Sequence, residues 1–105
     1  MIQPPVKMML ILIGENDSWK DRPLAESLMF RLHELGVAGA TVNKGVMGMG
    51  SHRKMHHKGL FGSSEDPPLT ITIFENESKL REIAAQIRDM APKAFMVMLD
   101  AEELP

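Results

Sequence analysis

Residues 6–13, VKMMLILI, decide the fold that this sequence predicts. The run is apolar at every position except Lys7 and stops at Gly14. Such a run is typical of a strand that is buried on both faces, not of a strand with one face in water. Residues 94–99, AFMVML, repeat the pattern near the other end of the chain. Both runs are therefore predicted to be strands with apolar side chains on both faces of a sheet.

Two helices are predicted between these strands. The first covers residues 24–35, where leucines recur at helical spacing, and Gly36 follows as a C-terminal stop. The second follows Asn76, a good N-terminal capping residue, and carries an apolar stripe over residues 80–90 before Pro92 ends it. Each helix is thus expected to bury one face against the sheet.

Apolar and polar residues alternate over 39–43 and 69–73, which indicates two further strands. No periodicity holds from Gly45 to Pro68, and a loop of that length in a small domain is typically functional. The order β-α-β-β-α-β predicts an α+β, ferredoxin-like fold in a single domain, residues 1–105. We expect a four-stranded antiparallel sheet, two helices on one face, and the long loop between the second and third strands.

The two helices can cover only one face of this sheet, yet the outer runs are apolar on both faces. No other predicted element is available to cover the second face. We therefore infer a homo-oligomer in which a partner subunit covers the open face.

Composition excludes several classes of protein. The 105 residues contain no cysteine, which rules out a disulfide framework, thiolate zinc sites and cysteine nucleophiles. The longest apolar run is too short to span a bilayer, and no leader-like segment opens the sequence, so a cytoplasmic location is expected. No serine has an evident base, so we expect no enzyme, and the short basic segment without interleaved aromatics argues against nucleic acid.

Residues 39–58, GATVNKGVMGMGSHRKMHHK, hold the candidate site. Gly45, Gly48 and Gly50 allow positive φ and close approach to a ligand, and their backbone N–H groups can form an anion-binding concavity. The alternative is a bulged strand end that turns into a loop. Lys44 and Arg53 are the cations expected to meet a phosphate.

Three interpretations remain open for the histidines of this segment. They belong to a solvated loop, or His52 and His56 contact a phosphate, or they bind a metal. In the metal alternative, Met47 and Met49 add soft thioether ligands to His52 and His56.

A polar connection, residues 15–21, follows the first strand. Glu15 there is either part of a solvated turn or lies near the ligand and selects its polar end. Trp19, the only tryptophan, is expected to pack against a neighbouring subunit instead of stacking on a base.

Three segments, ILIGEND, RPLAESLMFRLHELGVAGATV and KGVMGMGSHRKMHH, together resemble a PII-like family of unassigned function, related in fold to the nitrogen-regulatory PII signalling proteins. The resemblance covers residues 8–99. It implies a homotrimer with clefts between subunits where relatives bind adenine nucleotides. It also implies a flexible loop, residues 51–66 here, offered to a partner such as a membrane transport protein.

The first hypothesis is therefore a trimeric PII-like signalling protein whose clefts bind a small ligand, an adenine nucleotide. The predicted nucleotide-binding residues are Lys44, Gly45, Gly48, Gly50, His52, Arg53 and His56. The alternative is a soft-metal-binding or metal-tolerance protein that uses Met47, Met49, His52 and His56. A third hypothesis is a trimer that binds only protein and leaves its cleft empty.

Overall fold

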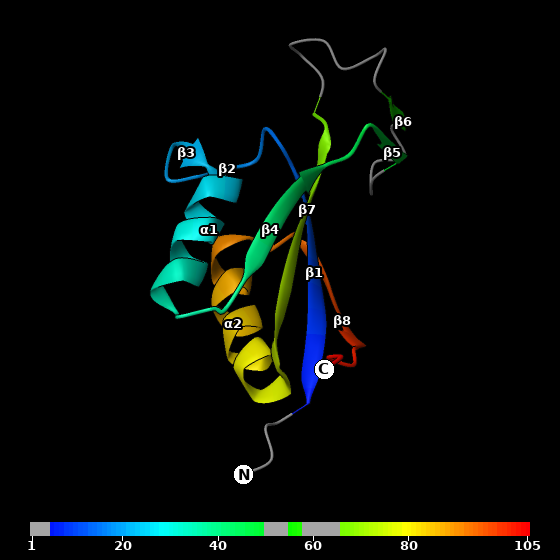
Figure 1. The fold of residues 1–105 in the computed structure, drawn as a ribbon. Helices are drawn as coiled ribbons and strands as arrows, with labels where there is room; N and C mark the ends of the chain where they lie inside the picture. The colour runs from blue at the N-terminus through cyan, green and yellow to red at the C-terminus, as the bar shows by residue number, and fades with distance from the viewer. Residues whose placement is uncertain (1–4, 50–54, 58–65) are drawn as a thin grey trace.

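The computed structural model describes residues 5–49, 55–57 and 66–105, and Figure 1 shows their arrangement. In chain order the elements are β1 (Val6–Gly14), β2 (Ser18–Trp19), β3 (Arg22–Pro23), α1 (Leu24–Glu34), β4 (Ala40–Lys44), β5 (Met47–Met49), β6 (Met55–His57), β7 (Pro68–Asn76), α2 (Glu77–Met90) and β8 (Phe95–Asp100). Neither α1 nor α2, the helices in the described part of the chain, is long and apolar enough to cross a membrane.

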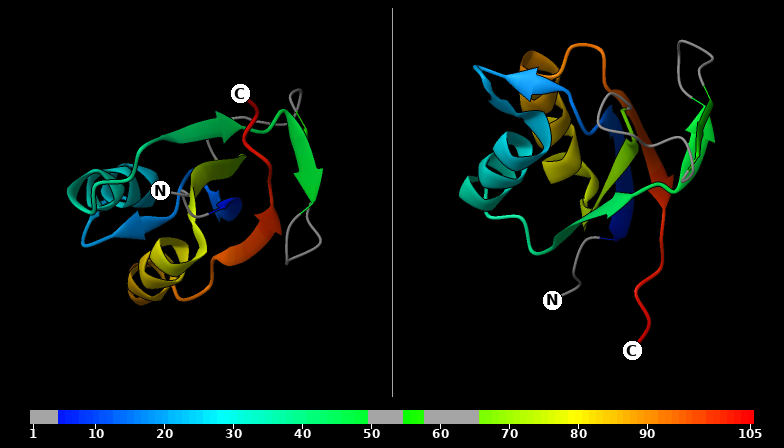
Figure 2. Two further views of the ribbon diagram at one scale, coloured as in Figure 1. Left: turned by 60° about the horizontal axis from the view of Figure 1, so that its bottom comes forward. Right: turned by 90° about the horizontal axis from the view of Figure 1, so that it is seen from above.

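Four strands form the main sheet in the order β4-β7-β1-β8, with every neighbouring pair antiparallel. Figure 2 shows α1 and α2 on one side of this sheet, and the β5–β6 ribbon beyond its other side. This order, with the two helices as crossovers, confirms the predicted ferredoxin-like α+β fold.

The core lies between the sheet and the two helices. Met9, Ile11 and Ile13 alternate along β1 and are all buried, as the two-residue period of a strand requires. Leu28 from α1 and Ile87 from α2 are fully buried against them. The leucine and isoleucine stripes found in the sequence thus form the helix faces that pack on the sheet.

The predicted helix ends are confirmed. At the end of α1, Gly36 has φ +72°, its N–H donates to the His33 carbonyl at 3.1 Å, and the Val37 N–H donates to the Leu32 carbonyl at 3.2 Å. This is the hydrogen-bond pattern of a Schellman motif, which favours glycine at the left-handed position. At the start of α2, Asn76 Oδ1 accepts a hydrogen bond from the Lys79 N–H at 2.9 Å.

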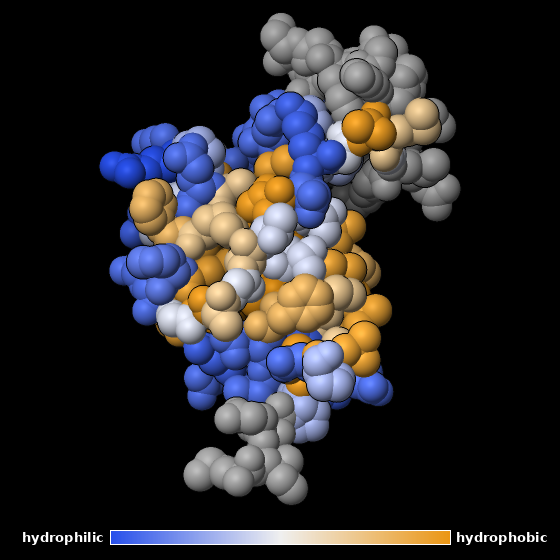
Figure 3. All heavy atoms as spheres, in the orientation of Figure 1, coloured by the Kyte–Doolittle hydropathy of each residue, from blue (hydrophilic) through white to orange (hydrophobic). Residues whose placement is uncertain are grey.

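The face of the sheet opposite the helices, called the open face below, carries large apolar side chains that the described residues leave partly exposed. The register places Leu10 opposite Val97 and Leu12 opposite Phe95, so these side chains share that face. Its apolar members from β1, β7 and β8 are Met8, Leu10, Leu12, Phe74, Phe95, Val97 and Leu99, and Thr70 and Thr72 of β7 share the face. Figure 3 shows hydrophobic side chains along the margin of the molecule beside β8. The expectation that two helices leave one apolar face uncovered is confirmed.

Three expectations were wrong in detail. The stretch from Gly45 to Pro68 contains the β5–β6 ribbon, and the polar connection contains β2, which pairs with β3 just after it. Strands of two or three residues are too short to show a period of two in the sequence. The strand predicted over 69–73 runs to Asn76, because Phe74 lies on the open face opposite Met8.

Candidate functional site

The last residues of β1 and β4 lie beside the first residues of β7 at one end of the sheet, the upper end in Figure 1. The candidate residues come together there. Lys44 ends β4 and Glu15 follows β1, and Lys44 Nζ lies 3.0 Å from Glu15 Oε1. Both side chains are half exposed, so this ion pair contributes little to stability. The lysine expected to meet a phosphate and the glutamate expected to select a ligand's polar end are therefore neighbours.

Gly45 and Gly48 pack against Pro68 at the start of β7. A Cβ added to Gly45 would lie 2.7 Å from Pro68 Cγ, and one added to Gly48 would lie 3.2 Å from the same atom. The Gly45 N–H donates to the Pro68 carbonyl at 2.7 Å. Neither glycine has a positive φ, so that part of the sequence interpretation was wrong for both. Close packing on a proline ring explains why glycine is needed at these positions.

Asp66, which the sequence did not single out, anchors the chain beside this site. Its Oδ1 accepts a hydrogen bond from the Asn16 N–H at 2.8 Å, and the Glu15 N–H donates to the Pro67 carbonyl at 2.9 Å. A Cβ on Gly14 would collide with the Asp66 carboxylate. The turn that carries Glu15 is therefore fixed by the residues that lead into β7. A single Asp before two prolines carries no sequence signal for this contact.

The β5–β6 ribbon holds the other described residues of the predicted site. Its register pairs Met47 with His57, Gly48 with His56, and Met49 with Met55. In this backbone register His56 is opposite Gly48, and not opposite Met47 or Met49, with which it was grouped in the metal alternative. Gly50, His52 and Arg53 lie outside the described residues.

No cluster of three or more His, Cys, Asp or Glu side chains in the described ranges 5–49, 55–57 and 66–105 is arranged to hold a metal ion. Methionine is outside that set of residue types.

Trp19 packs within its own chain. It is partly buried against the core, and Lys20 Nζ lies 4.6 Å from the centre of its ring. The contact is therefore with the core of its own chain, whereas packing against a neighbouring subunit was expected.

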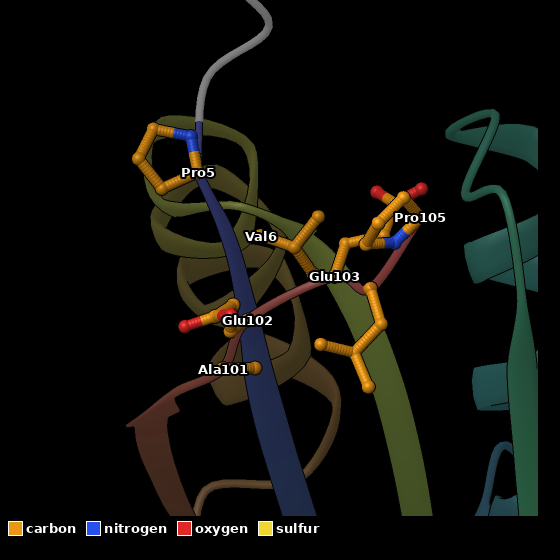
Figure 4. Close-up of a pocket in the computed structure, with 7 residues that line it drawn as sticks. Pro5, Val6, Ala101, Glu102, Glu103 and Pro105 are labelled. Atoms are coloured by element: carbon orange, nitrogen blue, oxygen red, sulfur yellow. The ribbon is translucent and has the colours of Figure 1, made fainter.

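A hollow of about 380 Å³ lies at the other end of the sheet, between the start of β1 and the C-terminal segment (Figure 4). Its lining includes Glu102 and Glu103, and none of the residues that line it is basic. Two carboxylates repel a phosphate, so this hollow is not suited to a nucleotide.

An ion-pair network lies near that end as well. Lys7 Nζ lies 2.5 Å from Asp100 Oδ1 and 3.5 Å from Glu77 Oε1, and Glu77 also pairs with Arg81 at 2.9 Å. The hydrogen bond to Asp100 raises the pKa of Lys7, and the same bond lowers the pKa of Asp100. The hydrogen bond from Arg81, more than the Lys7 charge, lowers the pKa of Glu77. These ion pairs link β8, β1 and α2 at the surface, where exposed pairs contribute little to stability.

Comparisons with known proteins extend this description. Residues 6–103 match the DUF190 family, described as "Uncharacterized ACR". A UPF0166 protein from Aquifex aeolicus (strain VF5) is 27% identical over 82 residues, which cover 78% of each chain.

Solved structures with similar folds include the following two. CPII, a nitrogen regulatory PII-like protein from Thiomonas intermedia K12, bound to ADP, AMP and bicarbonate, superposes with a TM-score of 0.71 at 19% identity, covering 94% of this chain and 88% of that chain. The divalent ion tolerance protein CutA1 from Ehrlichia chaffeensis gives a TM-score of 0.69 at 8% identity, covering 99% and 88%. At these identities the likeness concerns the fold.

Proposed function

The chain belongs to the DUF190 family and has the ferredoxin-like fold of PII-like proteins, and on that premise we propose that it is a regulatory protein that acts by binding rather than by catalysis. It assembles as a homotrimer in the cytoplasm and binds an adenine nucleotide in clefts between subunits. It presents residues 51–66 to a partner such as a membrane transport protein.

The open face is the observation that carries the assembly. Leu12 is 41% exposed, Phe74 48%, Phe95 61% and Leu99 41% in the single chain. Added together, the exposed surface of these four residues is nearly that of two fully exposed large apolar residues. Burying them stabilises an assembly by roughly 3–6 kcal/mol per subunit, before the entropy lost on association. A face of this kind, on the side away from both helices, favours a second copy of the same chain as its cover.

The nucleotide is supported by chemistry at the ends of β1 and β4 and by the PII-like structure that contains ADP and AMP. Lys44 pairs only with an exposed carboxylate among the described contacts, so a phosphate can compete with Glu15 for its ammonium group. The cleft in this proposal is lined by Lys44, Gly45, Gly48, Gly50, His52, Arg53 and His56. The partner-binding role rests on the position of the β5–β6 ribbon, beyond the ends of β4 and β7 (Figure 1).

Light scattering tests the assembly. Val97 lies on the open face, whereas Met96 and Met98 pack against the core. Val97→Lys should convert a trimer at micromolar concentration into a folded monomer, because the charge would have to be buried in an apolar contact. Ala85→Lys, on the exposed side of α2, is the matched control and should leave the trimer intact. A wild-type monomer, or a trimer that tolerates Val97→Lys, contradicts assembly through the open face.

Isothermal titration with AMP, ADP and ATP tests the ligand. We expect binding of at least one of them to the wild-type trimer, weakened by Lys44→Ala and by Arg53→Ala. Ala85→Lys again serves as the control. If a trimer forms but none of the three nucleotides binds at millimolar concentration, the nucleotide proposal fails while the assembly stands.

A further inference from the structure

The ion pair between Glu15 and Lys44 sets a condition on any phosphate that binds at the ends of β1 and β4. Lys44 Nζ lies 3.0 Å from Glu15 Oε1, and both side chains are half exposed. A phosphate that takes this ammonium group must displace the carboxylate. The displaced Glu15 keeps its negative charge, so it becomes a like-charged neighbour of the bound phosphate.

The backbone of Glu15 is held in place. Its N–H donates to the Pro67 carbonyl at 2.9 Å, and the Asn16 N–H donates to Asp66 Oδ1 at 2.8 Å. Only the side chain is therefore free to turn. A glutamate carboxylate reaches about 5 Å from its Cα, so rotation moves it by at most roughly 10 Å, which is about one Debye length at 0.1 M salt. The repulsion between Glu15 and a bound phosphate thus persists after the displacement.

Two further carboxylates lie against the same turn. Asp17 Oδ2 accepts a hydrogen bond from the Gly14 N–H at 2.9 Å, and a Cβ on Gly14 would collide with the Asp66 carboxylate. Three negative charges, those of Glu15, Asp17 and Asp66, are therefore gathered at the end of β1. Lys44 pairs with one of them, Glu15, among the described ion pairs. Each added negative charge on a ligand is opposed by this group.

The number of phosphates decides how strongly the carboxylates oppose a nucleotide. A phosphate monoester carries about 1.5–2 negative charges at neutral pH, and each further phosphate adds about one. Coulomb's law for one added charge about 8 Å from a carboxylate predicts binding weaker by about 3- to 30-fold, for effective dielectric constants between that of water and that of a protein surface. The single charge of Lys44 can offset this cost for one phosphate.

We propose that Glu15 is a specificity-determining residue, which makes the site select a nucleoside monophosphate over the corresponding di- and triphosphate. The selectivity rests on the proposed nucleotide site and narrows its ligand. Because Glu15 acts through its charge, its effect grows with the number of phosphates and falls as salt screens the charges.

Isothermal titration with AMP, ADP and ATP in the presence of EDTA measures the selectivity as the ratio of the Kd for ATP to the Kd for AMP. In the wild-type trimer AMP should bind most tightly. Glu15→Gln should tighten ATP at least about threefold more than AMP. Glu82→Gln, the same loss of charge at an exposed position of α2, is the matched control and should leave the ratio unchanged. Asp66→Asn, which keeps an oxygen for the Asn16 N–H, should narrow the ratio as well.

Salt separates an effect of charge from an effect of shape. The wild-type ratio should fall as salt is raised from about 0.05 M to about 0.5 M, and the ratio of Glu15→Gln should change less. Light scattering and thermal melts check that each variant remains a folded trimer. The selectivity is overturned, with the nucleotide site intact, if ATP binds the wild type as tightly as AMP or if Glu15→Gln keeps the wild-type ratio. If none of the three nucleotides binds, the site and its selectivity are both wrong.

Discussion

Replacing Gly45 by alanine tests whether this glycine serves packing or a ligand. The added Cβ would lie 2.7 Å from Pro68 Cγ and 3.4 Å from the Pro68 carbonyl oxygen. Non-bonded carbon atoms prefer separations of about 3.5–4.0 Å, so the proline ring or β4 must move by roughly 1 Å. The ring is rigid, and the hydrogen bond of 2.7 Å from the Gly45 N–H to the Pro68 carbonyl ties the two backbones together.

The magnitude follows from comparison with Gly39, which has nothing within 4 Å of an added Cβ. Gly39→Ala should raise the free energy of unfolding by about 0.4–1 kcal/mol, because alanine restricts the unfolded chain. Gly45→Ala gains the same entropy but adds overpacking, which typically costs 1–3 kcal/mol. The two variants should therefore differ by about 1–3 kcal/mol, which corresponds to at least about 4 °C in midpoint temperature for a domain of this size.

Thermal and urea unfolding at one fixed protein concentration measure this difference, with the assembly state checked by light scattering. A double-mutant cycle identifies the cause, because Pro68→Ala removes the ring carbon that Gly45→Ala would strike. The combined variant should lose less stability than the sum of the two single changes. If Gly45→Ala is as harmless as Gly39→Ala, or if the cycle shows no coupling, packing on Pro68 does not explain the glycine.

Three further outcomes are expected. Asn76→Ala should lower the free energy of unfolding by about 1 kcal/mol, because α2 loses its N-cap. Asn76→Asp, which keeps a capping oxygen, should not lower it, and urea unfolding of both variants measures the difference. Gly36→Ala should cost about 1–2 kcal/mol, since its φ of +72° disfavours a side chain although the nearest atom to an added Cβ is 3.8 Å away; an unchanged melting temperature would contradict this. The Lys7–Asp100 pair should stabilise the protein only between the ordinary pKa values of the two groups, 3.8 and 10.5. Because the folded-state pKa of Asp100 is lowered, its contribution is lost as pH falls below 3.8, and because that of Lys7 is raised, its contribution is lost as pH rises above 10.5. The free energies of unfolding of the wild type and Asp100→Asn should differ most at pH values in the middle of this range. A difference that is the same at every pH would rule the linkage out.

The sequence alone determined the main elements and where the helices end. The apolar run of β1, the leucine repeat of α1, and the stop at Gly36 all depend on residues within a few positions of one another. The same is true of the Asn76 cap, whose partner is three residues away. Local periodicity and capping carry this information for two reasons. A helix forms its hydrogen bonds between residues a few positions apart, and a strand shows its two-residue period within a short run. The fold class followed from the order of these elements.

Part of the candidate site was also available from the sequence. Lys44 and Glu15 were selected for their charge and their positions after predicted strands, and they lie 3.0 Å apart. Gly45 and Gly48 were selected for positive φ, whereas the structure shows each of them close to Pro68, which is at least 20 residues away along the chain.

Only the tertiary structure decided which residues face one another. Which of Met96, Val97 and Met98 lies on the open face depends on the register of β8 against β1. Likewise, the pairing of β5 with β6 sets His57, and not His56, opposite Met47. A shift of one residue in either pairing would reverse these assignments, because the side-chain period of a strand is two. A period of two is visible in a sequence, but the choice of face is made by contacts between strands that lie far apart in the chain.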